Sequence, residues 1–68
     1  MIEVVEKGAL KAGGLMKLAS ELGIKHQAFY SWTKVPAERV LDFERATGIS
    51  RHELRPDVYG PAPEAVGP

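Results

Sequence analysis

The chain has 68 residues, with nine Lys and Arg balanced by nine Asp and Glu, and it contains no cysteine. This length allows one domain with a single small core, and the lack of cysteine excludes a disulfide framework and a thiolate metal site. No apolar run reaches the roughly 18 residues of a membrane span, and the acidic N-terminal residues do not resemble a signal peptide, so we expect a cytoplasmic protein without a membrane partner.

The first predicted helix covers residues 2–12. Its apolar residues recur at the spacing of one helix face, namely Ile2, Val5, Ala9 and Ala12. Gly8 lowers the stability of an isolated helix by about 1 kcal/mol relative to alanine, and the pair Gly13 and Gly14 ends the segment.

Two further helices follow closely. One is predicted over residues 15–22, where four apolar side chains form an amphipathic stripe: Leu15, Leu18, Ala19 and Leu22. Gly23 then suits a left-handed C-terminal cap. The other is predicted over residues 26–33, and its buried side consists of Ala28, Phe29 and Trp32.

A fourth helix is predicted over residues 36–47, with Pro36 in its first turn and Gly48 after its end. Ser50 and Glu53 have the spacing of a capping box, which predicts one helical turn over residues 51–55, closed by Pro56.

The fold class is therefore all-α, a small bundle of four to five helices, because no strand pattern occurs. The predicted domain covers residues 1–59. Residues 60–68 contain three Pro and two Gly, and this density predicts a flexible tail without regular structure.

Residues 15–34 have the features of a helix-turn-helix unit. Ala19 is small enough for the two helices to cross closely, and Gly23 supplies the positive φ that a tight turn favours. Apolar side chains hold both sides of the turn: Leu18, Leu22, Ile24, Phe29 and Trp32. The second helix then has an outer face that is free to enter the major groove of DNA.

At these positions the sequence resembles the Cro and repressor proteins of lambdoid phages, over roughly residues 9–59. The continuation over residues 35–40 and 44–57 is similar to the Cro-like subgroup of YdaS-type antitoxins. The resemblance implies a lambda-repressor-like DNA-binding domain that acts as a dimer on a short palindromic site. Lys25 and Gly14 depart from the pattern, because many relatives have a capping residue and a polar phosphate contact there.

Seven residues form the candidate DNA-binding surface of this unit: Lys17, Lys25, His26, Gln27, Tyr30, Ser31 and Lys34. The Gln27 amide suits an adenine edge, Ser31 can donate or accept, and lysines suit guanine or phosphate. Residues 1–34, which contain this surface, have five Lys and three Glu, whereas residues 35–68 have four Arg and six Asp or Glu. The expected partner is double-stranded operator DNA, and the alternative is an ordinary solvated polar face.

A chain of zero net charge makes few phosphate contacts, so tight binding requires two copies on neighbouring half-sites. We therefore expect a homodimer that acts as a transcriptional regulator, in the manner of a repressor. Leu41, Val58 and Tyr59 are the candidates for the contact between the copies.

Other functions are tested against the same residues. Trp32 is able to stack on a base, but its place in the motif favours a core position. His26 and His52 are far apart and have no cysteine beside them, so neither a metal nor another cofactor is expected. No phosphate-binding loop or nucleophile motif occurs, and we expect no enzyme activity. Two alternatives stay open, an antitoxin that also binds a toxin protein and a small helical protein-interaction module.

Overall fold

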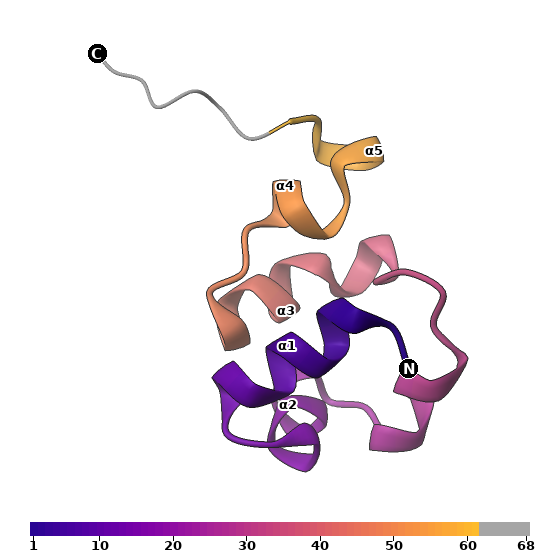
Figure 1. The fold of residues 1–68 in the computed structure, drawn as a ribbon, viewed down its shortest axis with the longest axis vertical. Coiled ribbons are helices and arrows are strands. Elements are labelled where there is room, and N and C mark those ends of the chain that lie inside the picture. Colours follow the sequence, from indigo (N-terminus) through magenta and orange to yellow (C-terminus); the bar gives the residue numbers. More distant parts are fainter. Residues whose placement is uncertain (62–68) are drawn as a thin grey trace.

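The computed structural model describes residues 1–61, which fold into a small bundle built entirely from helices and connecting turns (Figure 1). The elements in chain order are α1 (Glu3–Ala12), α2 (Leu15–Leu22), the 3₁₀ helices η1 (His26–Ser31) and η2 (Ala37–Arg39), α3 (Val40–Thr47), α4 (Arg51–Leu54) and α5 (Pro56–Tyr59). The all-α prediction is therefore confirmed. The predicted tail lies almost entirely outside the described residues.

The core lies where α1, α2 and α3 meet, with η1 and the following loop closing one side. Six side chains in it have no exposed surface: Val5, Leu18, Phe29, Val35, Val40 and Phe43. The Trp32 ring is half-buried against this core, edge-on to Phe29 with ring centroids 4.9 Å apart. Trp32 thus packs inside the domain, as its position in the motif predicts.

Gly8 allows α1 and α3 to approach closely. A Cβ atom at this position would lie 2.7 Å from Cζ of Phe43 and 3.1 Å from Cγ2 of Thr47, and atoms at such distances must move apart. The sequence alone indicates only the cost of a glycine within a helix. The structure adds the reason for that glycine, because a buried aromatic ring occupies the space that a side chain would need.

Two predicted helices differ from those observed. Residues 26–33 form a 3₁₀ helix that ends at Ser31 rather than an α-helix. Lys25 precedes it without a side-chain cap, and aromatic residues have low helix propensity, so a short, tighter helix is favoured there. The predicted helix over residues 36–47 is divided into η2 and α3, because Arg39 has φ −107° and ψ −3°.

The C-terminal turns also differ from the expected capping box. The Ser50 hydroxyl accepts a hydrogen bond from the His52 N–H at 3.1 Å, and the Glu53 carboxylate pairs with Lys7 of α1 at 3.0 Å instead of returning to the cap. Pro56 does follow α4, but it also begins α5, where a proline suits the first helical position.

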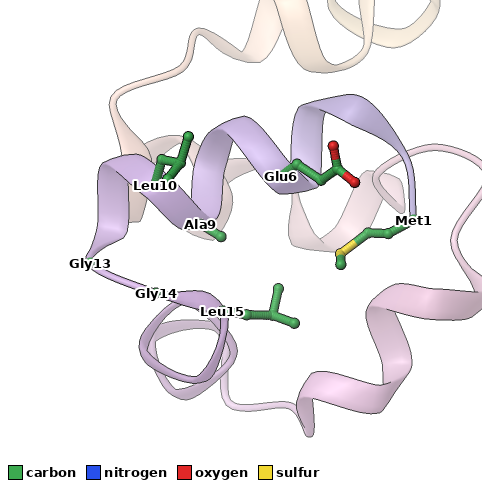
Figure 2. A pocket seen from close by; sticks show the side chains of 7 residues that line it. All are labelled: Met1, Glu6, Ala9, Leu10, Gly13, Gly14 and Leu15. Carbon is green, nitrogen blue, oxygen red and sulfur yellow. The ribbon is translucent and has the colours of Figure 1, made fainter.

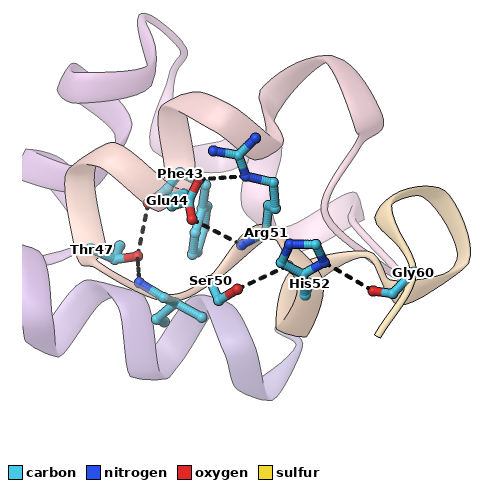
Figure 3. A network of polar contacts seen from close by, with 8 residues as sticks. Phe43, Glu44, Thr47, Ser50, Arg51, His52 and Gly60 are labelled. Atoms are coloured by element: carbon cyan, nitrogen blue, oxygen red, sulfur yellow. Dashed lines mark hydrogen bonds and ion pairs between the residues drawn. The ribbon is translucent and has the colours of Figure 1, made fainter. Parts of the chain in front are cut away.

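A polar network holds α4 against the end of α3 (Figure 3). The Thr47 hydroxyl donates to the Phe43 carbonyl at 2.8 Å and accepts from the Ile49 N–H at 3.0 Å. The Glu44 carboxylate accepts from both the backbone N–H and Nε of Arg51, at 3.2 and 3.1 Å. These bonds set the direction in which the chain leaves α3.

Arg55 joins the C-terminal turns to the loop after η1. Its guanidinium donates to both carboxylate oxygens of Asp57, at 2.9 and 2.8 Å, and to the Val35 carbonyl at 2.9 Å. The Arg55 side chain is only 12% exposed. The hydrogen bond from Arg55 lowers the pKa of the Asp57 carboxyl to about 2, so this pair stays charged at neutral pH.

Candidate nucleic-acid interface

The turn between α2 and η1 is built as the sequence predicts. Gly23 ends α2 with φ 71°, in the left-handed region, and its N–H reaches the Ala19 and Ser20 carbonyls. The Ile24 N–H also reaches the Ala19 carbonyl, at 3.0 Å. These bonds satisfy the last carbonyls of α2 and reverse the chain within a few residues. Ala19 itself is buried, and only 3% of its surface is exposed to solvent.

Arg39, the last residue of η2, also contacts this turn. Its Nη1 donates to the Leu22 carbonyl at 3.3 Å, so η2 is joined to the last residue of α2. The Arg39 side chain was not singled out in the sequence analysis, because a contact between residues 17 positions apart leaves no local pattern.

The 3₁₀ geometry of η1 determines which of its side chains face solvent. With three residues per turn, positions three apart lie above one another. One row contains His26 and Phe29, which are half-buried and buried, and it faces the core. A second row contains Gln27 and Tyr30, both exposed, with Tyr30 61% exposed. The third row, formed by Lys25, Ala28 and Ser31, is exposed only at its two ends, so η1 presents a narrow outward face rather than a broad helical surface.

Lys25 and Ser31 lie at the two ends of η1, and both are exposed. The Ser31 hydroxyl donates to the Ala28 carbonyl at 2.9 Å, which leaves its oxygen as an acceptor. Lys25, Gln27, Tyr30 and Ser31 thus belong to one short exposed element. His26, predicted on the outer face, is instead drawn toward the core by the three-residue repeat.

Lys34 and Lys17 lie in different surroundings. Lys34, in the loop after η1, has its Nζ 3.9 Å from the Asp57 carboxylate of α5, so a negative charge lies beside this lysine. Lys17 lies on α2, and its Cδ would be 3.6 Å from a Cβ placed on Gly13. The stem of Lys17 therefore passes Gly13, at the turn between α1 and α2.

Other kinds of site are less well represented in the described part of the chain. Residues 1–61 contain no group of three His, Asp or Glu side chains placed to hold a metal ion. None of the described helices is long and apolar enough to cross a membrane. A groove of about 590 Å³ lies between α1 and α2, and its lining is apolar except for Glu6.

The chain matches the family model described as "Bacterial toxin YdaS" over residues 5–63, which is most of its length. It belongs to this family, in agreement with the YdaS-type resemblance of residues 35–40 and 44–57. The family's description names a toxin, whereas the sequence resembles antitoxin-type relatives. Searches of the curated proteins and of the solved structures returned no match.

Proposed function

We propose that this protein binds double-stranded DNA as a transcriptional regulator of the helix-turn-helix class, acts as a repressor, and catalyses no reaction. One observation carries the proposal: the turn at Gly23 presents η1 with Phe29 buried in the core and with Gln27 and Tyr30 exposed. An element of this kind can insert between the phosphate backbones and offer side chains to base edges.

The exposed row suits base recognition, and Lys25 beside it suits phosphate. The Gln27 amide can pair with adenine through one donor and one acceptor, whereas Lys25 supplies a point charge that any phosphate attracts. Tyr30 adds a large exposed ring with a hydroxyl at its tip. Because η1 is short, we expect few base contacts from each copy and tight binding only by two copies on neighbouring half-sites.

The decisive experiment is selection of bound fragments from random duplex DNA, followed by anisotropy titrations on the selected and a scrambled duplex. Gln27→Ala should weaken binding to the selected duplex about 5- to 150-fold, the loss of about 1–3 kcal/mol for one base contact, and should scarcely change binding to the scrambled one. Equal losses on both duplexes would reject base recognition by η1. Absence of duplex binding by the wild type at low salt would reject the proposal and favour a protein-interaction module.

The family description favours a second candidate, a role in a toxin–antitoxin pair. Induction of the chain in growing bacteria tests it, since a toxin arrests growth and an antitoxin protects against its partner. Growth arrest that persists in a Gln27→Ala, Lys25→Ala double variant would indicate a toxicity that does not depend on the proposed DNA contacts of these two side chains. Arrest that this variant abolishes would instead be a consequence of DNA binding.

A further inference from the structure

An exposed apolar surface lies between α1 and α2, outside the proposed DNA face. Leu10 on α1 is 86% exposed and Met16 on α2 is 67% exposed, although both belong to well-formed helices. Single exposed apolar residues are common, but Leu10 also lines an apolar groove, and an exposed apolar side chain beside an apolar hollow marks an interaction surface.

Figure 2 shows how the groove is built. Ala9 and Leu15 point into the space between the two helices, Met1 closes one end, and Leu10 stands at the rim. At the other end, Gly13 and Gly14 carry no side chain to fill the space, and no atom of the described residues lies within 4 Å of a Cβ placed on Gly14. The surface thus has a projecting leucine beside a hollow of matching apolar character.

We propose that this groove is the contact between two copies of the chain, related by a two-fold axis. A two-fold interface uses the same patch on both copies, so the patch must be complementary to itself. This patch meets that requirement, because Leu10 of one copy can enter the hollow formed by Ala9, Leu15 and Met1 of the other.

Charge at the two ends of the groove supports the same partner. Glu6 lies at the Met1 end of the groove, and Figure 2 shows it far from Gly13 at the opposite end. The Lys17 stem passes Gly13. Within residues 1–61 neither Glu6 nor Lys17 takes part in an ion pair. An antiparallel arrangement of two copies brings each Glu6 toward the partner's Lys17, and zero net charge removes long-range repulsion between the copies.

The size of the patch indicates a weak dimer. Stable interfaces bury about 800 Å² on each partner, and a groove lined by parts of two short helices is smaller. The copies should therefore separate at low concentration and pair on DNA, where neighbouring half-sites raise their effective concentration. This placement differs from the sequence-based candidates Leu41 and Val58, which are 46% and 49% exposed and do not line this groove.

The test is sedimentation equilibrium of the full chain without DNA, so its outcome is independent of the proposed DNA binding. The average mass of the wild type should rise from 7.4 kDa toward twice that value with increasing concentration. Leu10→Gln should raise the dissociation constant at least about tenfold, and Met16→Gln should raise it less. Leu41→Gln is the matched control and should leave it unchanged. Helical circular dichroism checks that each variant is folded, which the exposure of these side chains favours.

A charge exchange tests the two-fold arrangement. Glu6→Lys and Lys17→Glu should each weaken pairing, and the double variant should restore it, because the two charges then meet with reversed signs. A wild type that keeps the mass of one chain up to millimolar concentration would overturn the proposal. So would a Leu41→Gln variant that dissociates as readily as Leu10→Gln, or a double charge variant that pairs no better than the two single variants.

Discussion

The two halves of the chain use their positive charges differently. Residues 1–34 contain all five lysines, and residues 35–68 contain all four arginines. Each arginine contacts an acceptor within the domain: Arg39 the Leu22 carbonyl, Arg45 Asp42, Arg51 Glu44, and Arg55 both Asp57 and Val35. Among the lysines, Lys11, Lys17 and Lys25 have no ion-pair partner in the described part of the chain.

This difference follows from the chemistry of the two side chains. A guanidinium has several donors in a fixed plane and can bond two acceptors at once, as Arg55 does, whereas an ammonium is a hydrated point charge on a flexible stem. The arginine-rich half braces the fold, and the lysine-rich half leaves charge available to a partner. Variants in the two halves should therefore affect different measurements.

The largest effect is expected where the two halves meet, at Gly8. Gly8→Ala would stabilise an isolated helix by about 1 kcal/mol, but here it should destabilise the domain by about 1–3 kcal/mol through overpacking, because the new Cβ would lie 2.7 Å from the Phe43 ring. Denaturant unfolding measures the change. In a Phe43→Leu background the same substitution should cost less, and equal costs in both backgrounds would disprove the contact.

Removal of an internal arginine contact should have the next largest effect. Arg39→Met deletes the donor to the Leu22 carbonyl and should cost about 1 kcal/mol. Arg45→Met is the control, since Arg45 is 76% exposed and pairs with Asp42 on the surface, and exposed pairs contribute less than about 1 kcal/mol. Thermal unfolding of both variants compares the two losses of stability. A loss for Arg39→Met no larger than that for Arg45→Met would show that Arg39 has no structural role.

The Arg55–Asp57 pair should make the stability of the domain depend on pH in the acidic range. The pKa of Asp57 is lowered from 3.8 to about 2 in the folded domain, so the folded state binds this proton less readily than the unfolded state. The resulting stability is fully present above about pH 4 and is lost as the pH falls toward 2. Asp57→Asn should lower the unfolding midpoint at pH 7 and converge with the wild type near pH 2. A difference that stays constant over this range would contradict the assignment.

The smallest change in stability is expected for Lys25, the exposed lysine that precedes η1. Lys25→Ala should alter the free energy of unfolding by no more than about 0.5 kcal/mol, as for an ordinary surface site. If Lys25 contacts phosphate, the slope of the binding constant against salt should fall by about one ion on selected and scrambled DNA alike. A loss of stability without any change in salt dependence would show that Lys25, like the arginines, stabilises the fold rather than binding phosphate.

Local pattern was sufficient for much of the fold. Helix ends were predictable where a glycine adopts a left-handed conformation, and Gly13, Gly23 and Gly48 all end helices with positive φ. The position of the turn and the buried side of η1 follow from Gly23 and from the spacing of apolar residues. The type of helix in η1 was not predictable, because a short aromatic segment has no strong preference between a three-residue and a 3.6-residue repeat.

The candidate site was predictable as a segment but not as a surface. Lys25, Gln27 and Tyr30 are exposed on one element, whereas Lys17 passes Gly13 and Lys34 lies beside Asp57. A change of helix repeat rotates side chains around the axis, which accounts for the half-buried His26. The sequence indicates the exposure of Leu10 only weakly, because this leucine falls outside the apolar stripe of residues 2–12.

By itself the sequence determined the helical class, the glycine-capped turn, the apolar core and the division between lysine-rich and arginine-rich halves, since these depend on residue type and on spacing within one turn of chain. Tertiary structure decided the close approach at Gly8, the bracing by Arg39 and Arg55, and the groove beside Leu10. The first two features join residues distant in the sequence, such as Arg39 with Leu22 and Arg55 with Val35, and the groove depends on the angle between α1 and α2. Their distances are set by how the helices pack, and no local pattern encodes them.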